Sequence, residues 1–219
     1  MSFAQNYHRW IIDELQPFFG DCVAEVGAGI GSVSRMLLAR PIKRLHAFEP
    51  SRNMFPYLER ELAREERATA VNDFFGRRHA QPGFDSVAYI NVLEHIEDDR
   101  AELAHAYSAL KPGGHVLVFV PALAWLYSDF DRQVGHFRRY GRNELEERVK
   151  EAGFSIVKSN YFDFAGVIPW YVAFVLMRRS LGGGSVSLYD KLAVPVTRFL
   201  EGLVSPPLGK NILLVARKG

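Results

Sequence analysis

Short apolar runs alternate with amphipathic stretches along the chain, and this alternation is the main structural signal in the sequence. Apolar runs bounded by turn residues predict strands over 23–26, 44–49, 69–72, 84–91, 115–121, 154–161 and 211–217. Stretches with helical periodicity predict helices over 3–19, 32–40, 53–66, 100–110, 143–152 and 188–204. Strands that alternate with helices at this spacing favour a doubly wound α/β sheet with right-handed crossovers.

Residues that can carry chemistry lie at the carboxyl ends of four of the predicted strands. They are the glycine turn 27–31, Glu49, Asp73 and the segment 91–95. Ligands of open α/β sheets bind at the carboxyl ends of the strands. The sequence therefore predicts one ligand site that is built from these four places.

The turn after the first predicted strand contains Gly27, Gly29 and Gly31. Glycine lets the backbone turn sharply and approach a ligand closely, and the helix that follows brings unpaired N–H groups to the same place. The spacing differs from the dinucleotide fingerprint, because Ser32 stands where that pattern has its third glycine. Glu25, at the end of the strand, would repel a pyrophosphate but suits a ligand that carries an ammonium group.

Two other strand ends suit parts of a nucleoside. A carboxylate at Glu49, at the tip of the second strand, can accept hydrogen bonds from both hydroxyls of a ribose. Asp73, followed by the aromatic Phe74, could bond an adenine amino group and stack on its ring. A plain turn with a buried Phe explains the same two residues equally well.

Five segments of the chain carry a family resemblance. EVGAGIG, FEPS, FDSVAYINVLEHIEDD, LKPGGHVLVFVPA and EAGF, in this order and at these spacings, resemble the class I S-adenosylmethionine (SAM)-dependent methyltransferases. The resemblance covers about residues 5 to 160. It implies a Rossmann-like seven-stranded sheet of order 3-2-1-4-5-7-6, with strand 7 antiparallel and helices on both faces. It also implies SAM as the cofactor and S-adenosyl-L-homocysteine as its product.

Carried over by position, the resemblance implies a role for each strand end. Glu25 and the glycine turn lie near the methionine part of the cofactor, Glu49 binds the ribose, and Asp73 with Phe74 meets the adenine. Asn91 and the turn after it line the wall beside the sulfonium. The residues expected to bind the cofactor are Glu25, Gly27, Ala28, Gly29, Gly31, Glu49, Pro50, Asp73, Phe74, Asn91, Val92, Leu93 and His95.

Residues 121–142 are predicted to form a long loop that folds over the ligand site, since loops of this length in compact domains are usually functional. Within it, GHFRRY preceded by SDFD resembles a subgroup of bacterial methyltransferases whose substrates are poorly defined. We expect Arg138 or Arg139 to hold an acidic group of the acceptor. His136 or Tyr140 would act as a general base or orient the acceptor.

Two other interpretations of this loop stay open. Asp129 and Asp131 could be salt-bridge partners of Arg132 and of the Arg138–Arg139 pair. The two carboxylates could also bind a metal together with His136. Nothing in the sequence completes that ligand set, so no metal site is expected.

Four aromatic residues outside the SDFD and GHFRRY segments are also expected to contact the acceptor. Tyr7 and Trp10 share an apolar face of the helix predicted over 3–19, which either packs on the domain or closes over the cofactor or substrate. Trp125 and Tyr127 lie in the predicted loop and are assigned to the substrate side as well.

The insert 163–209, before the last predicted strand, has three interpretations. It carries the apolar aromatic run 164–177 and the helix predicted over 188–204. We interpret it as a helical cap over the sheet edge and the substrate pocket. A dimer surface and an interfacial membrane contact are the alternatives.

Composition narrows the setting of the protein. The 219 residues predict a single domain, 1–219, with a sizeable core. A net charge of +2 gives no argument for a nucleic-acid partner. The single cysteine, Cys22, excludes an internal disulfide and fits a reducing compartment. No basic stretch with an apolar run opens the chain, and the run 164–177 is too short to span a bilayer. We therefore expect a cytoplasmic location.

The function predicted from these features is methyl transfer from SAM to a small-molecule or lipid/saccharide acceptor, at O or N. The protein would act as a monomer or homodimer. A non-catalytic SAM-binding module that serves a partner enzyme is the main alternative. A nicotinamide oxidoreductase is disfavoured by Ser32 and Glu25. An RNA methyltransferase is disfavoured by the near-neutral charge and by Asn91-Val92-Leu93-Glu94 in place of an Asn/Asp-Pro-Pro-Tyr/Phe motif.

Overall fold

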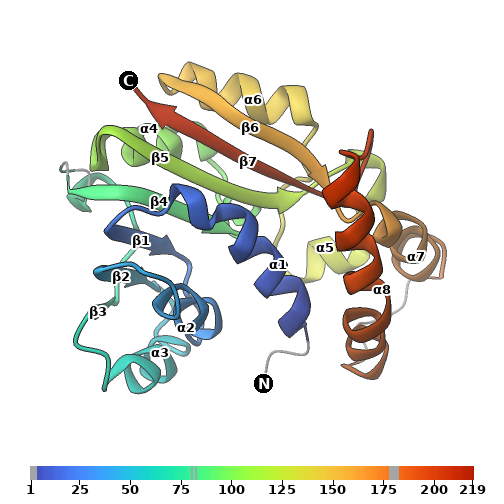
Figure 1. The fold of residues 1–219 in the computed structure, drawn as a ribbon, viewed down its shortest axis with the longest axis horizontal. Helices are drawn as coiled ribbons and strands as arrows, with labels where there is room; N and C mark the ends of the chain where they lie inside the picture. Colours follow the sequence, from blue (N-terminus) through green and yellow to red (C-terminus); the bar gives the residue numbers. More distant parts are fainter. Residues whose placement is uncertain (1–3, 80, 82, 178–182) are drawn as a thin grey trace.

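A seven-stranded sheet forms the centre of the computed structural model, which describes residues 4–79, 81, 83–177 and 183–219, with side chains for all of these except 183–186. The strands run in the order β3-β2-β1-β4-β5-β7-β6 (Figure 1). They are β1 (Cys22–Val26), β2 (Arg44–Phe48), β3 (Ala68–Val71), β4 (Phe84–Ile90), β5 (Leu110–Pro121), β6 (Phe154–Phe162) and β7 (Asn211–Lys218). β7 pairs antiparallel with β5 and β6, and the other pairs are parallel. The predicted order and the antiparallel strand are confirmed.

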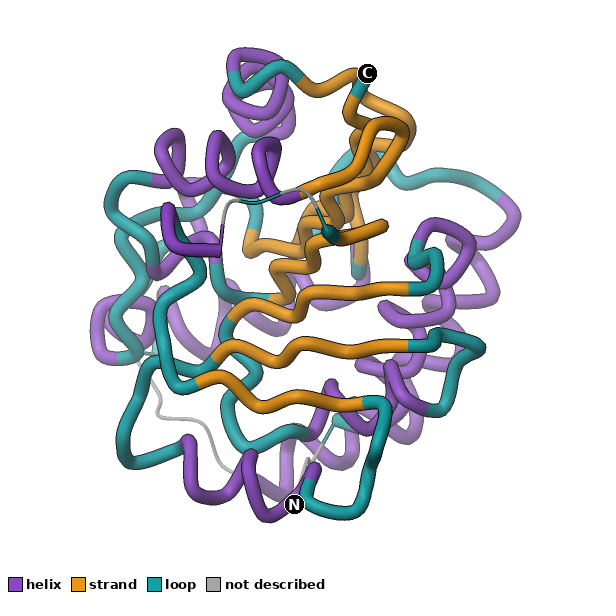
Figure 2. Tube along the Cα trace, turned by 90° about the vertical axis from the view of Figure 1, so that its left-hand side faces the viewer, coloured by secondary structure: helices purple, strands orange, loops and turns teal. Residues whose placement is uncertain are grey.

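Helices cover both faces of this sheet, which Figure 2 shows as one continuous, twisted stack of strands. Successive strand residues contribute to opposite faces: Ala24 packs with α4 and α6, while Val23 packs with α1, α2 and α3. Two covered faces explain why the strands read as continuous apolar runs. The helices are α1 (Gln5–Leu15), α2 (Ser32–Leu38), α3 (Phe55–Leu62), α4 (Asp99–Ala109), α5 (Asp129–Gln133), α6 (Arg142–Glu151), α7 (Val167–Trp170) and α8 (Gly183–Leu203).

Helix ends differ most from the sequence predictions. The helix expected over 3–19 is α1 followed by a separate 3₁₀ turn, Gln16–Phe18, because Pro17 cannot continue the α-helical hydrogen bonding. The helix expected over 53–66 is the shorter α3. The N-cap of α2 is Gly31, in the left-handed conformation. The helix expected over 143–152 is α6, which begins one residue earlier with Gly141 as its N-cap.

The segment 121–142 is not the irregular loop that the sequence predicts. It contains a 3₁₀ turn, Ala124–Leu126, and the helix α5. Ala122 and Tyr140 form a parallel bridge that brings its two ends together. Ser128 and Asp131 cap α5 reciprocally, which fixes the start of the helix. Short-range capping and one bridge therefore order the chain here without a long regular element.

The insert before β7 is helical, as expected, and α5, α7 and α8 gather where β5 ends and β7 begins (Figure 1). α8 packs on α1, and the Asp190 carboxylate accepts hydrogen bonds from the backbone N–H groups of Asn6 and Tyr7. Large apolar side chains of α8 remain exposed, among them Leu188, Leu192, Val196, Phe199 and Leu203. Among the described residues, no helix combines the length and apolarity needed to cross a membrane.

Candidate functional site

The glycine turn lies between β1 and α2, and each of its glycines has a positive φ: 69° at Gly27, 59° at Gly29 and 89° at Gly31. A Cβ on Gly27 would lie 2.6 Å from the side chain of Val92, and one on Gly31 would lie 3.0 Å from Glu61. A Cβ on Gly29 would meet nothing within 4 Å. Gly27 and Gly31 are therefore packing positions, while Gly29 leaves backbone open to a ligand.

Glu49 joins the tip of β2 to this turn. One carboxylate oxygen accepts a hydrogen bond from Gly29 N–H (2.7 Å) and the other accepts one from Ser51 N–H (2.8 Å). The Asn72 side-chain amide, after β3, donates to the backbone carbonyl of Glu49 (2.8 Å). The ends of β1, β2 and β3 thus meet around one buried carboxylate. Ala28 adds a second link, since its N–H donates to the Phe48 carbonyl (2.9 Å).

Glu25 is buried behind the glycine turn, where the Ser34 hydroxyl donates to its carboxylate (2.6 Å). Burial raises the pKa of Glu25 to about 8, against a lowering by the Ser34 hydrogen bond, and the Glu49 charge raises it further. A buried carboxyl group of this kind gains from a positive charge brought beside it. That property suits the ammonium group that the sequence analysis assigned to this position.

Asp73 and Phe74 follow β3 at the same edge of the sheet. The Asp73 carboxylate accepts from Phe74 N–H (2.9 Å) and from His79 Nε2 (3.3 Å), and the hydrogen bond from His79 is the main cause that lowers its pKa. Phe74 is 75% exposed, whereas Phe75 is 3% exposed and packs in the core. The buried Phe of the plain-turn alternative is therefore Phe75, and the ring of Phe74 is accessible.

The segment after β4 splits between the site and the core. Asn91 is exposed and has a φ of 54°, a conformation that Asn adopts more readily than most residues. Val92 packs against Gly27, and Leu93 is fully buried in the hydrophobic core. Leu93 is thus a core residue, which corrects the expectation that its side chain faces the cofactor. Asn91, Val92 and His95 remain predicted cofactor contacts from this turn; His95 is exposed, and its Nδ1 bonds the carbonyl of Gly135 (3.2 Å).

Glu94 is the residue of this turn that the sequence analysis did not single out. Its side chain is fully buried, and neither carboxylate oxygen has a hydrogen-bond partner among the described residues. Burial raises the pKa of Glu94 to about 8, although its own backbone N–H and the charge of Arg139 act against this rise. The local sequence Leu93-Glu94-His95 does not predict that this carboxylate is buried without a partner, because its surroundings depend on residues some forty positions later in the chain.

A pocket of about 320 Å³ lies beside Asn91, at the carboxyl ends of β4 and β5. Its walls come from α1, from the segment 121–142, from α7 and from the start of β7. The lining residues are Tyr7, Asn91, Glu94, Pro121, Phe130, Val134, His136, Arg139, Trp170, Lys210 and Asn211. Aromatic rings and a few convergent polar groups are typical of a small-molecule site.

Asp131 organises the part of the segment 121–142 that faces this pocket. Its buried carboxylate accepts hydrogen bonds from Ser128 N–H (2.8 Å), His136 Nδ1 (2.9 Å) and Arg139 Nε (2.9 Å). Burial would raise the pKa of Asp131, but His136 and Arg139 lower it to about 2. Arg139 also lies 4.6 Å from the ring centre of Trp170. His136 and Arg139 are therefore held rigidly at the pocket wall.

The ion-pair interpretation of this segment holds for two of the three arginines that it involved. Arg132 pairs with Asp129, and Arg139 pairs with Asp131. Arg138 pairs instead with Asp99 at the start of α4 (2.7 Å) and donates to the Glu97 carbonyl (2.8 Å). Arg138 does not line the pocket, so of the two arginines expected to hold an acidic group, only Arg139 is placed for it.

Tyr140 and Trp10 belong to the core, which corrects two of the predictions. The Tyr140 hydroxyl is buried and donates to Asp99 (2.7 Å); burial and that carboxylate raise its pKa far above the usual range. A phenol in this state cannot serve as a general base at neutral pH. Trp10 is 2% exposed and its ring centre lies 3.8 Å from that of Phe162. Trp10 therefore packs the N-terminal helix onto the domain and does not close over a ligand.

The other aromatic predictions fall on both sides of the pocket wall. Tyr7 lines the pocket and its hydroxyl donates to Asn211 (3.0 Å). Tyr127 donates to the backbone carbonyl of His136 (2.7 Å) and so positions that residue. Trp125 is 55% exposed and packs edge-on against Tyr171, outside the pocket lining. Of the substrate-contacting aromatics predicted from the sequence, Tyr7 is the one at the pocket surface.

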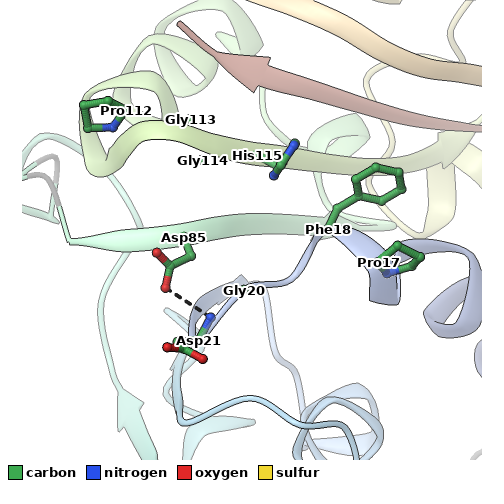
Figure 3. A pocket seen from close by; sticks show the side chains of 9 residues that line it. All are labelled: Pro17, Phe18, Gly20, Asp21, Asp85, Pro112, Gly113, Gly114 and His115. Atoms are coloured by element: carbon green, nitrogen blue, oxygen red, sulfur yellow. Dashed lines mark hydrogen bonds between the residues drawn. The ribbon is translucent and has the colours of Figure 1, made fainter.

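A second hollow, of about 400 Å³, lies at the opposite end of the sheet (Figure 3). It is lined by Phe18, Gly114 and His115, and Asp85 points toward Asp21, whose backbone N–H it binds (3.1 Å). Asp85 also pairs with Lys111 (2.7 Å). The amino ends of the parallel strands are not where open α/β sheets bind ligands. The smaller pocket at the carboxyl ends is therefore the candidate site.

Comparison with known proteins agrees with this geometry. The family model for a methyltransferase domain matches residues 24–116. Phosphoethanolamine N-methyltransferase 2 of Caenorhabditis elegans is 28% identical over 102 residues, which is 45% of this chain and 23% of that protein. The matched part therefore spans about a quarter of that relative.

Solved structures show the same fold over nearly the whole chain. An S-adenosylmethionine-dependent methyltransferase from Mesorhizobium loti is 16% identical, with a TM-score of 0.66 over 94% of this chain and 95% of that one. The N-methyltransferase NodS from Bradyrhizobium japonicum, solved with S-adenosyl-L-homocysteine, is 15% identical, with a TM-score of 0.62 over 99% of this chain and 88% of that one.

At these identities the structures bear on the fold alone, and the sequence match to a methyltransferase domain covers residues 24–116, which is less than half of the chain. The matched segment contains the glycine turn, Glu49 and the turn after β4, which are the parts that meet at the candidate site. Residues 24–116 thus resemble a methyltransferase domain, and the chain shares the fold of the SAM-dependent methyltransferases among these solved structures.

Proposed function

We propose that this protein transfers the methyl group of SAM to an oxygen or nitrogen atom of a small-molecule or lipid/saccharide acceptor. The observation that carries the proposal is the open backbone at Gly29 beside the Glu49 carboxylate, with an aromatic-lined pocket next to it at Asn91. A donor site and an acceptor site that share one wall are what a transfer reaction needs.

The residues at the strand ends fit SAM. Glu49 offers a carboxylate to the ribose hydroxyls, with the Gly29 N–H as its present partner. Glu25 is a buried carboxyl group whose raised pKa favours a cationic neighbour, as the ammonium group of the methionine part would be. The exposed ring of Phe74 offers a stacking surface for adenine. SAM supplies a methyl group already activated on a sulfonium.

The protein's own contribution is alignment and the exclusion of water. Phe130 and Trp170 give the acceptor pocket an apolar aromatic wall, and Lys210 and Arg139 add fixed positive charges that Asp163 and Asp131 balance. His136 presents the one imidazole in the pocket lining, with Nδ1 bound to Asp131. A proton on the acceptor would therefore be oriented or removed at the other nitrogen, Nε2.

The insert supports a role as a cap over the acceptor. Trp170 of α7 lies in the insert and Lys210 directly follows it, and both belong to the pocket lining, so the insert borders the acceptor pocket. The exposed apolar side chains of α8 suit an acceptor with a lipid part or a second protein surface. We further propose that the protein acts as a monomer or homodimer.

Calorimetry with SAM and with S-adenosyl-L-homocysteine tests the donor site. We expect micromolar binding of both by the wild type and loss of binding in Glu49→Ala and in Gly29→Val, whose side chain would fill the open space at the turn. Glu59→Ala and Gly202→Ala are matched controls, since Glu59 is exposed on α3 and a Cβ on Gly202 meets nothing within 4 Å. Unchanged affinity in Glu49→Ala would show that the donor site is misplaced.

A further inference from the structure

Glu94 is an isolated acidic group in the acceptor pocket. It is fully buried, it lines the pocket, and both of its carboxylate oxygens lack a hydrogen-bond partner among the described residues. A buried polar group without a partner costs about 1–3 kcal/mol, and a charged one costs more. The nearby Arg139 does not remove this cost, because its guanidinium is hydrogen-bonded to Asp131 instead. Glu94 is thus available to a cation that the protein does not itself provide.

Two histidines stand next to this carboxylate. Nε2 of His136 lies 3.9 Å from a carboxylate oxygen of Glu94, and the ring centres of His136 and His95 are 4.6 Å apart. One ligand atom from each of the three side chains lies within 4.8 Å of the others. Donor atoms around a tetrahedral ion, each 2.0–2.2 Å from it, lie roughly 3.5 Å apart. Closing the cluster therefore takes side-chain movements of about an ångström.

The hydrogen bonds around the histidines fix the tautomers that metal binding requires. His136 donates from Nδ1 to Asp131 (2.9 Å), and His95 donates from Nδ1 to the carbonyl of Gly135 (3.2 Å). In each neutral ring the lone pair is then on Nε2. A metal-binding histidine nearly always gives its second nitrogen to a carboxylate or a carbonyl in this way. The supporting contacts of a metal site are therefore present for both rings.

We infer that Glu94, His95 and His136 form a binding site for one divalent transition-metal ion at the wall of the acceptor pocket. Two imidazoles and one carboxylate favour Zn²⁺, Mn²⁺, Fe²⁺ or Co²⁺ over Mg²⁺ and Ca²⁺, which prefer oxygen ligands alone. This differs from the ligand set considered from the sequence, in which Asp131 was a direct ligand. Asp131 instead binds the far nitrogen of His136.

The metal site does not depend on the donor site, but its use rests on the proposed function. Three protein ligands leave coordination positions for an atom of a bound molecule. An acceptor hydroxyl bound there would lose its proton more readily, as metal-bound water does. His136 would then act through the metal rather than as a free base.

Metal binding is measured on metal-free full-length protein by titration with Co²⁺, followed by its visible absorption, and then by displacement with Zn²⁺. We expect one Co²⁺ per chain and a loss of affinity of at least tenfold in each of Glu94→Gln, His95→Gln and His136→Gln. His115→Gln, at the opposite end of the sheet (Figure 3), and Glu66→Gln, on the surface, are the matched controls. Thermal melts without metal show whether each variant is folded.

Two outcomes would overturn the site. One is a lack of specificity: the wild type binds Co²⁺ no more tightly than Glu94→Gln does, or His115→Gln weakens Co²⁺ binding as much as His136→Gln does. The other is that the protein fails to bind Co²⁺ but, free of metal, binds methylammonium, and that Glu94→Gln abolishes this methylammonium binding. Glu94 would then serve an organic cation. SAM calorimetry on the same metal-free samples tests the proposed function separately, so failure of one is distinguishable from failure of the other.

Discussion

Glu25 and Glu49 show how two carboxyl groups at neighbouring strand ends differ through their partners. Glu49 accepts hydrogen bonds from two backbone N–H groups, which satisfy its charge. Glu25 has the Ser34 hydroxyl, and burial raises its pKa to about 8. At neutral pH the carboxyl group of Glu25 is therefore mostly protonated in the cofactor-free protein.

We predict that SAM binding near pH 7 releases up to one proton, because an ammonium group beside Glu25 favours the ionised carboxylate and lowers its pKa. Calorimetry in buffers of different ionisation enthalpy measures this number directly. Glu25→Gln should abolish the release, and at pH 9 the wild type should release little, since the carboxyl group is already ionised. Equal proton release by wild type and Glu25→Gln would contradict the assignment.

The same pKa gives the sign of a stability effect. A carboxyl group whose pKa is raised from 4.5 to about 8 on folding stabilises the native state at low pH. This contribution is fully present below pH 4.5 and is lost as the pH rises toward 8, at on the order of 1.4 kcal/mol per pKa unit. The unfolding free energy of Glu25→Gln should fall less over this range than that of the wild type.

At the scale of elements, Asp99 fastens the segment 121–142 and α6 to the start of α4. It accepts hydrogen bonds from Tyr140 (2.7 Å) and Arg148 (2.5 Å), and it pairs with Arg138 (2.7 Å). Burial would raise the pKa of Asp99, but these three partners keep it below the ordinary value. Its stabilising effect is therefore present at neutral pH and declines as the pH falls through that lowered pKa.

Asp99→Asn should lower the free energy of unfolding by about 3 kcal/mol, because it removes the buried carboxylate that Tyr140 and the half-buried Arg138 and Arg148 share. Urea unfolding followed by circular dichroism measures the change. Asp98→Asn is the neighbouring control: Asp98 caps α4 through Ala101 N–H (3.0 Å), and Asn caps equally well, so its effect should stay below about 0.5 kcal/mol. A similar loss in both variants would show that Asp99 is not the fastening point.

On the scale of the whole molecule, the proposed donor site joins the ends of four neighbouring strands. β1, β2, β3 and β4 each end there, and the acceptor pocket adds α1, α7 and the start of β7. A ligand that bridges these strand ends should stabilise the global fold, because unfolding any one of them removes its contacts.

We predict that SAM at one hundred times its dissociation constant stabilises the protein by about 2.7 kcal/mol. For a chain of this size the midpoint of thermal unfolding should rise by roughly 5–10 °C. Differential scanning fluorimetry measures the shift, and Glu49→Ala should show none at the same SAM concentration. A shift that persists in Glu49→Ala would mean that SAM stabilises the protein from another place.

The sequence by itself determined the strands, the glycine turn and the ligand edge of the sheet. Apolar runs and turn residues act within a few positions, so β1, β2, β4, β6 and β7 lie close to where their patterns predict them. The sheet order came from the resemblance of the motifs rather than from any single strand. Glu25, the glycines and Glu49 were predicted as cofactor contacts because each stands at the end of a strand, where folds of this kind present ligand-binding residues.

Only the tertiary structure decided which neighbours these side chains have. Arg138 and Arg139 are adjacent in the chain, yet one turns to Asp99 and the other to Asp131. Tyr140 is polar enough to suggest catalysis, but its burial depends on α4. Glu94 has no hydrogen-bond partner for its carboxylate among the described residues, yet it lies close to His136, because packing places residues forty positions apart at one pocket wall. Such contacts form through three-dimensional packing, and local patterns in the sequence carry no record of them.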